Sequence, residues 1–257
     1  MYAELSRLAM YYDAYGDPQN PSVVLLHGGM SSALTWAEQI DALTPRYRVL
    51  VPEQQGHART IDLDAPLTYQ AMAGDTIEFL ERIAGRPAHV VGHSDGGILA
   101  LIIAIQRPDL LDRVVAIGAN FHKDGLYRSA IVDADPNADE FADSRESYAS
   151  LSPNGLSHWP VIFAKTEHMM RTEPTLTPAD IATIATPTLV MVGDDDVIAH
   201  SHSVELYEAL PEGQLAIVPG TSHGLKKEKP DLVNRLIIDF LTDPTLPSTR
   251  KTIRTPR

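Results

Sequence analysis

The chain of 257 residues contains no cysteine, which excludes disulfides, thiolate nucleophiles and cysteine-bound metals or iron–sulfur clusters. It also lacks any apolar run near the about 18 residues that a membrane-spanning helix requires. The N-terminus has no basic start followed by an apolar core, as a secretory signal would have. We therefore expect a cytoplasmic protein with no membrane partner.

Basic residues are scarce: 21 Lys and Arg stand against 34 Asp and Glu, for a formal net charge of −13. Such an acidic surface repels nucleic acid, so no nucleic-acid partner is expected. The one basic cluster lies among threonines and prolines within residues 243–257, which we interpret as a flexible tail rather than a binding arm. Nothing in the composition indicates an oligomeric state.

Short apolar runs recur along the chain and alternate with longer helical patterns. They are rich in Val, Ile and Leu and cover residues 22–27, 47–52, 89–92, 113–118, 188–193 and 214–219. Continuous rather than alternating apolarity is typical of strands buried on both faces. Between them, a helix is predicted from Thr68 to Gly85, and another begins at Pro230. The alternation predicts an α/β fold with a doubly wound, mostly parallel sheet.

One segment interrupts this alternation. Residues 121–180 contain no convincing strand pattern and are rich in Asp, Ser, Pro, His and Met. A segment of this length between strands is typical of a functional insertion, so we predict a small helical lid there. Residues 1–120 and 181–242 would then form the core. The lid contributes aromatic and Met side chains, among them Trp159, that suit an apolar pocket wall or the attachment of the lid.

The first candidate catalytic motif is "VVGHSDGG". In it, Gly92-x-Ser94-x-Gly96 follows an apolar strand and precedes a predicted helix that ends before Pro108. This strand–turn–helix context is that of a nucleophile elbow. The small flanking residues let strand and helix approach closely, and the sharp turn exposes the Ser94 hydroxyl at the carboxyl edge of the sheet. Open α/β sheets bind their ligands at that edge.

A serine hydroxyl needs a base to accept its proton. Among ten histidines, His223 is the best placed, because it follows the last predicted strand and precedes the final helix. His93 flanks the serine, but the turn should direct its side chain away from Ser94, and we interpret it as a packing residue. His200 and His202 have no third ligand at a fitting spacing, so no metal site is predicted.

The base in turn needs a carboxylate that orients it. Asp194, Asp195 and Asp196 follow a strand together. Because three neighbouring carboxylates repel one another, one should turn inward to the histidine while the others face water.

These blocks resemble the α/β-hydrolase superfamily over about residues 8 to 242. Four motifs carry the resemblance, in order and at the family's spacing: "LLHGG", "GHSDGG", "VGDDD" and "PGTSHG". The resemblance implies a triad of Ser94, Asp196 and His223, with Asp194 or Asp195 as the alternative acid. It also implies an oxyanion hole formed by the backbone N–H groups of Gly29 and Asp95.

The resemblance is weakest at residues 53–60, "EQQGHART", where the family often has another pattern. We expect this block to shape the sheet edge rather than the chemistry. Met30 and Trp36 are candidates either to line the acyl side of the pocket or to pack beneath it, and Met30 and Trp159 are the predicted substrate-binding residues.

The family's activity implies a cofactor-free serine hydrolase that cleaves a small carboxylic ester or lactone through an acyl-enzyme on Ser94. Relatives with an aspartate nucleophile are excluded by the serine. A C–C bond hydrolase, a perhydrolase and a weakly catalytic small-ligand receptor are the alternatives. The Asp95 carboxylate either stabilises the positive end of its helix or favours substrates that carry a positive group.

Overall fold

A single mixed sheet forms the centre of the protein in the computed structural model, which describes residues 1–127 and 134–242. Its spatial order is β1-β2-β4-β3-β5-β6-β7-β8. The strands are β1 (Tyr2–Glu4), β2 (Ala9–Tyr15), β3 (Ser22–Leu26), β4 (Arg48–Pro52), β5 (Ala88–His93), β6 (Leu111–Ile117), β7 (Thr188–Asp195) and β8 (Gly213–Ser222). β1 and β2 pair antiparallel and the other strands run parallel. The predicted α/β sheet is therefore present.

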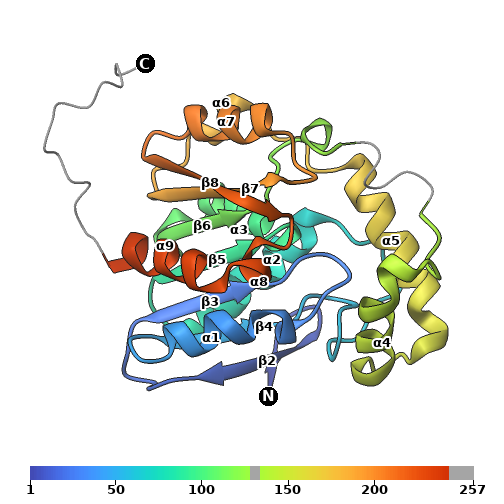
Figure 1. Ribbon diagram of the computed structural model, residues 1–257. Coiled ribbons are helices and arrows are strands. Elements are labelled where there is room, and N and C mark those ends of the chain that lie inside the picture. The colour runs from blue at the N-terminus through green and yellow to red at the C-terminus, as the bar shows by residue number, and fades with distance from the viewer. Residues whose placement is uncertain (128–133, 243–257) are drawn as a thin grey trace, which may run out of the picture.

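Helices cover both faces of this sheet (Figure 1). They are α1 (Ala37–Leu43), α2 (Tyr69–Phe79), α3 (Asp95–Gln106), α4 (Ala142–Leu151), α5 (Trp159–Thr172), α6 (Pro178–Ile181), α7 (His200–Ala209), α8 (Leu225–Glu228) and α9 (Pro230–Thr242). The predicted caps are present: the Thr68 hydroxyl accepts from the Ala71 N–H at 3.1 Å, and Gly85 is left-handed. α9 begins at Pro230, as predicted.

The parallel strands bury alternate side chains in two cores, one on each face. In β3, Val23 and Leu25 join the core beneath α1 and α9, whereas Val24 and Leu26 join the core beneath α2 and α3. Burial on both faces explains why these strands are continuous apolar runs. The register places Leu26 beside Gly92, and Gly92 beside Ala116, so the loops after β3, β5 and β6 meet at one edge.

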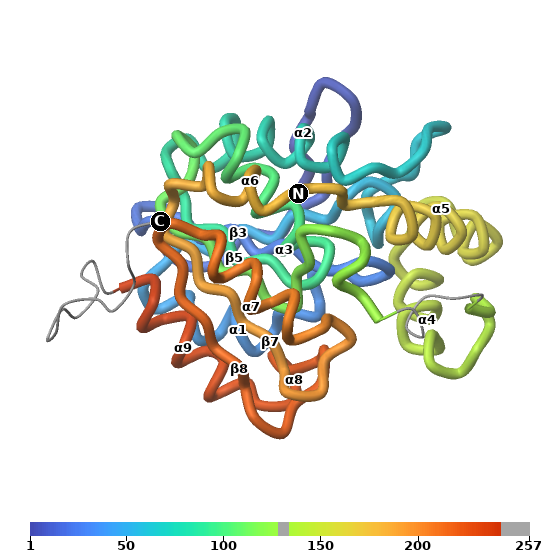
Figure 2. The backbone as a smooth tube through the Cα atoms, turned by 90° about the horizontal axis from the view of Figure 1, so that it is seen from above, coloured from blue at the N-terminus to red at the C-terminus, as the bar shows by residue number. Residues whose placement is uncertain are grey.

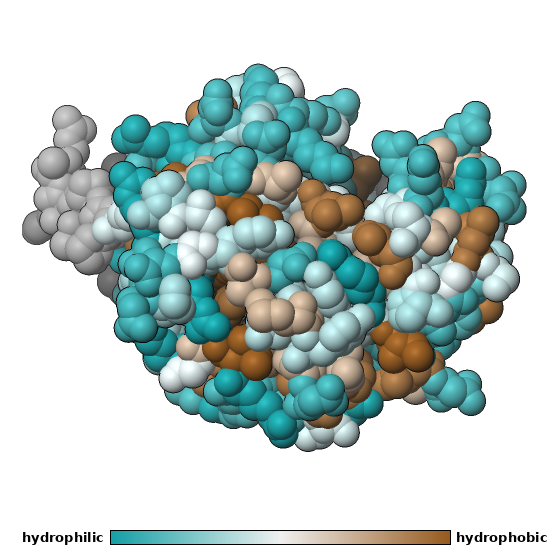
Figure 3. Space-filling model, turned by 90° about the horizontal axis from the view of Figure 1, so that it is seen from below, coloured by the Kyte–Doolittle hydropathy of each residue, from teal (hydrophilic) through white to brown (hydrophobic). Residues whose placement is uncertain are grey.

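The segment between β6 and β7 contains α4 and α5, which stand to one side of the sheet (Figures 1 and 2). Viewed from below, this part is a lobe beside the main body, and hydrophobic residues form separate patches on the surface (Figure 3). The two ends of the segment are tied together: the Leu176 N–H donates to the Phe121 carbonyl at 3.0 Å, and the Lys123 N–H donates to the Pro174 carbonyl at 2.8 Å.

The strands β1 and β2 have no counterpart among the predicted strands. β2 is half-exposed over most of its length, so its sequence has no apolar run. The predicted tail at 243–257 and residues 128–133 of the predicted lid lie outside the described residues. Within the described ranges, no helix is both long and apolar enough to cross a bilayer.

Candidate active site

Ser94 sits in the turn between β5 and α3, with a backbone φ of 54° and ψ of −120°. A non-glycine residue rarely adopts this conformation, which costs on the order of 1–3 kcal/mol and is typical of functional sites. The turn is possible because its neighbours lack side chains: a Cβ on Gly92 would overlap the Gly96 carbonyl, and one on Gly96 would overlap the Leu26 carbonyl. The Ser94 N–H donates to the Ile117 carbonyl at 2.8 Å, which fixes the turn against β6.

Asp196 and His223 meet at the same edge of the sheet, from the loops after β7 and β8. The His223 Nδ1 and the Asp196 Oδ1 lie 2.8 Å apart. The Asp196 side chain is fully buried and also accepts from the Ile198 and Gly193 N–H groups. Burial alone raises the pKa of Asp196, but the hydrogen bonds and the charge of His223 outweigh it and hold that pKa below its usual value. The aspartate is therefore ionised and can orient the imidazole.

The His223 ring lies against Gly118, the residue that follows the strand to which Ser94 is bonded. The His223 ring and Ser94 thus lie at the same edge of the sheet. The Ser94 hydroxyl forms no hydrogen bond with another described residue. His93 Nε2–H donates to the His223 carbonyl at 2.9 Å, and the two rings are 4.8 Å apart. Sequence reasoning treated His93 as packing and missed this bond, for which no local pattern exists.

The other acidic and histidine candidates have separate roles. Asp194 is exposed and accepts from the Thr221 N–H at 3.0 Å, and Asp195 is exposed. His200 donates to the Gly193 carbonyl, whereas His202 accepts from the Phe121 N–H. Among residues 1–127 and 134–242, no three His, Asp or Glu side chains form a group that could hold a metal.

The backbone N–H groups of Gly29 and Asp95, the predicted oxyanion donors, have no acceptor among the described residues. The backbone N–H of the next residue, Met30, donates to His57 Nε2 at 3.1 Å. Burial, together with the neighbouring His27, lowers the pKa of His57 to about 4, so its imidazole is neutral and can accept this bond. His57 Nδ1 is fixed by the Gln55 carbonyl at 2.9 Å.

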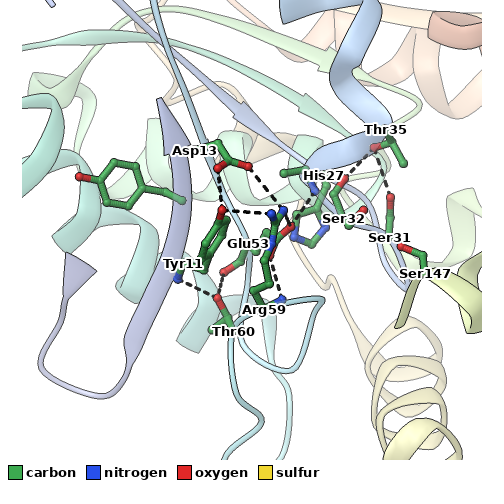
Figure 4. A network of polar contacts seen from close by, with 12 residues as sticks. Tyr11, Asp13, His27, Ser31, Ser32, Thr35, Glu53, Arg59, Thr60 and Ser147 are labelled. Carbon is green, nitrogen blue, oxygen red and sulfur yellow. Dashed lines mark hydrogen bonds and ion pairs between the residues drawn. The ribbon is translucent and has the colours of Figure 1, made fainter. Parts of the chain in front are cut away.

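The block 53–60 therefore also supports the loop after β3. Glu53 is fully buried, accepts from the Ala33 N–H at 3.2 Å and pairs with Arg59 at 2.6 Å. The same network connects Tyr11 and Asp13 to the block (Figure 4). We expected this block only to shape the sheet edge. The hydrogen bond from the Met30 N–H to His57, 27 positions along the chain, was not expected.

A small cavity separates the lid from the loop after β3, and both predicted substrate-binding residues line it. Met30 lines it from the loop, and Trp159 and Tyr148 line it from the lid. Trp159 is nearly fully buried, and its indole N–H donates to the Pro136 carbonyl at 2.8 Å, so it also holds the lid together. Trp36 packs in the core beneath α1 instead.

The Asp95 side chain, at the first position of α3, is 4% exposed. Its Oδ1 accepts from the Tyr69 hydroxyl at 2.7 Å, a contact that sequence reasoning missed. Burial raises the pKa of Asp95 to about 6, despite the opposing effects of the Tyr69 bond and the His223 charge.

The strained serine between strand and helix, the buried aspartate that bonds to a half-buried histidine and the doubly wound sheet together are typical of a hydrolase fold. The sequence model of the Alpha/beta hydrolase family matches residues 23–236, and the chain belongs to that family.

Similar proteins span almost the whole chain. "Putative carbamate hydrolase RutD" of Stutzerimonas stutzeri (strain A1501) is 30% identical over 261 residues, covering 91% of this chain and 97% of that protein. "Uncharacterized hydrolase YugF" of Bacillus subtilis (strain 168) is 24% identical, covering 90% and 94%. Among solved structures, the enol-lactonase from Burkholderia xenovorans LB400 matches with a TM-score of 0.76 and 20% identity, covering 95% of this chain and 100% of that one. This structural likeness shows the fold.

Proposed function

We propose that the protein is a serine hydrolase that cleaves a small carboxylic ester or lactone through an acyl-enzyme on Ser94. The observation that carries the proposal is the buried Asp196 carboxylate, 2.8 Å from His223, at the edge where Ser94 is held in a strained turn. Met30 and Trp159 are proposed to contact the substrate. Met30 follows the proposed oxyanion donor Gly29, and both residues line the cavity between the loop and the lid, whose lining does not include Ser94 or His223.

The chemistry follows from these positions. The Ser94 Oγ attacks the carbonyl carbon while His223 Nε2 takes its proton, and Asp196 stabilises the resulting imidazolium. The N–H groups of Gly29 and Asp95 bind the oxyanion, and each such donor lowers the barrier by about 3 to 4 kcal/mol. His223 then gives the proton to the leaving alkoxide. Water, deprotonated by His223, releases the acid and regenerates Ser94.

A labelling and turnover experiment tests this proposal. The wild type should react with a fluorophosphonate probe and hydrolyse short p-nitrophenyl esters at pH 8. Ser94→Ala and His223→Ala should each lower kcat by up to about a millionfold, and Asp196→Ala somewhat less. A wild type that is neither labelled nor active would contradict the proposal and favour a ligand receptor of the same fold.

The choice of acid within "DDD" has its own control. Asp196→Asn should abolish most of the activity because it removes the charge that holds the histidine, whereas Asp194→Asn and Asp195→Asn should retain it. The opposite order of effects would assign the role to an exposed carboxylate and refute our assignment.

Carbamate hydrolysis is a second candidate, favoured by the name of the relative that is 30% identical over nearly the full chain. A carbamate differs from an ester by a nitrogen on the carbonyl carbon, and the same serine chemistry applies. Turnover of a p-nitrophenyl carbamate beside an ester series would rank the two. Products of C–C bond cleavage or peracid formation would identify the remaining alternatives.

A further inference from the structure

One oxygen of the Asp95 carboxylate has no partner. While Oδ1 is held by Tyr69, Oδ2 is fully buried, and no donor of the described chain bonds to it. A buried carboxylate oxygen without a hydrogen bond is costly, so it indicates either strain or a partner that arrives with a ligand.

Oδ2 points at the loop that carries the proposed oxyanion donor. A Cβ placed on Gly29 would stand 2.5 Å from Oδ2 and 2.5 Å from the Met170 methyl group, with the Thr166 methyl at 3.2 Å. The oxygen therefore lies beside Gly29, and the Met170 and Thr166 methyl groups of the lid helix α5 approach the same glycine. No donor of the described residues bonds to this oxygen, and the low polarity of the nearby methyl groups strengthens any hydrogen bond made there.

The position also creates an electrostatic conflict. A negative carboxylate beside Gly29 repels the negative charge that develops on a substrate carbonyl in the proposed reaction. A neutral apolar ester leaves this repulsion in place. A substrate that brings its own N–H donor to Oδ2 reduces this repulsion and gives the unpaired oxygen a hydrogen-bond partner at the same time.

We propose that Asp95 is a specificity-determining residue, whose Oδ2 accepts a hydrogen bond from an N–H group on the acyl half of the substrate. The inference rests on the proposed function and narrows its substrate class to aminoacyl esters or carbamates. It assigns two functions to one residue: the backbone N–H binds the oxyanion, and the side chain selects the acyl group.

Three p-nitrophenyl compounds with the same acyl skeleton test this inference. The butanoate has no N–H group. The β-alaninate replaces its terminal methyl with an ammonium group, and the N-ethylcarbamate replaces its first methylene with N–H. The kcat/KM is measured for the two esters and the second-order rate of carbamoylation for the third, in the wild type, Asp95→Asn and Asp75→Asn.

Asp95→Asn is the informative variant, because the Tyr69 hydroxyl would hold the amide oxygen and the NH2 group would face the substrate. Asp75 is the matched control. It is 2% exposed, its pKa is likewise raised by burial to about 6, and it bonds to Arg7 instead of facing the site. Dividing each rate by that for butanoate cancels general damage to folding or catalysis.

In Asp95→Asn, the rate ratio to butanoate should fall about tenfold or more for at least one N–H compound. Asp75→Asn should leave both ratios within about twofold. The ratio that falls identifies the donor as ammonium or carbamate. Equal changes for all three compounds would overturn the inference and leave Asp95 as a helix-terminus charge.

A binding measurement keeps this result separate from the proposed function. The ethyl ester of each acid and ethyl N-ethylcarbamate are titrated calorimetrically into Ser94→Ala and into Ser94→Ala/Asp95→Asn. If the wild type hydrolyses nothing, the hydrolase proposal fails, and the dissociation constants still decide the role of Asp95. Loss of affinity confined to the N–H ligands would support it, and unchanged affinities would overturn it.

Discussion

Two neutral histidines hold backbone atoms on either side of Ser94. His57 accepts from the Met30 N–H, and His93 donates to the His223 carbonyl. Burial lowers the pKa of both rings, so each keeps one donor and one acceptor nitrogen. These positioning residues fix the loops that carry Gly29 and His223.

The role of His57 can be tested with His57→Leu. Without the acceptor, the Met30 N–H is left buried and unpaired, and the neighbouring Gly29 N–H loses its fixed direction. We expect kcat to fall about tenfold or more with a smaller change in KM, since oxyanion contacts act mainly in the transition state.

His89→Leu is the matched control, because His89 is a buried histidine near the opposite end of β5. It should leave kcat largely unchanged, because the buried His89 Nδ1 bonds to none of the described residues. A similar fall in kcat for both variants would show that His57 acts only through packing.

The positions that depend on local order could be predicted from sequence. Ser94, Asp196 and His223 each follow a strand, and parallel strands bring such positions to one edge. His57 and Tyr69 could not be predicted, because their partners lie 27 and 26 positions away and no local pattern marks such pairs.

At the scale of elements, Asp62 fastens the lid to the core. Its buried carboxylate accepts from His158 Nε2 at 2.8 Å and Lys165 Nζ at 2.7 Å, both in the lid, and from Gln55 at 3.2 Å. Burial alone raises the pKa of Asp62, but the bonds from Lys165, His158 and Gln55 lower it below its usual value. The Asp62–Lys165 pair is therefore ionic, and it joins α5 to the segment between β4 and α2.

Asp62→Asn should loosen α5. Breaking a buried ion pair leaves the remaining charge unpaired, and we expect a loss of about 2 kcal/mol, with faster amide hydrogen exchange in α4 and α5. Glu167→Gln is the control, because the Glu167–Arg171 pair lies within α5 and is more exposed. Unchanged exchange in Asp62→Asn would refute the fastening role.

The strands β3 to β7 could be predicted because both of their faces are buried. β8 lies at the edge of the sheet and is partly exposed, and it could be predicted because its apolar run is continuous. β1 and β2 could not, because their exposed positions interrupt the apolar pattern. The helical insertion was predicted from its lack of strand patterns, but its attachment through Asp62 depends on contacts between distant segments.

At the scale of the whole molecule, Lys226 links stability to pH. It is 2% exposed, donates to the Thr35 carbonyl and lies 4.4 Å from the centre of the Trp36 ring. Burial and the neighbouring Lys227 lower its pKa from 10.5 to about 7. Between these two values the unfolded chain binds the extra proton, so this residue makes the protein more stable as pH rises from 7 to 10.5.

Lys226→Met should remove this dependence. Its unfolding free energy should exceed that of the wild type by roughly 2 to 4 kcal/mol more at pH 6 than at pH 10. Urea denaturation at both pH values measures the difference. The exposed Lys227→Met is the control and should change it less, because it removes only the smaller cause of the lowered pKa and leaves the burial of Lys226 in place. If Lys226→Met changes the unfolding free energy equally at both pH values, Lys226 does not titrate with a lowered pKa in the folded protein.

The hydrogen bonds that join Phe121 to Leu176 and Lys123 to Pro174 also affect how the protein can evolve. The insertion leaves the sheet and returns to it at one place, so its length and sequence can change without displacing β6 or β7. Relatives could thus exchange this segment and acquire new acyl selectivity while the residues at the positions of Ser94, His223 and Asp196 stay in place. Chimeras that join at these two hydrogen-bonded pairs should fold and retain the core chemistry.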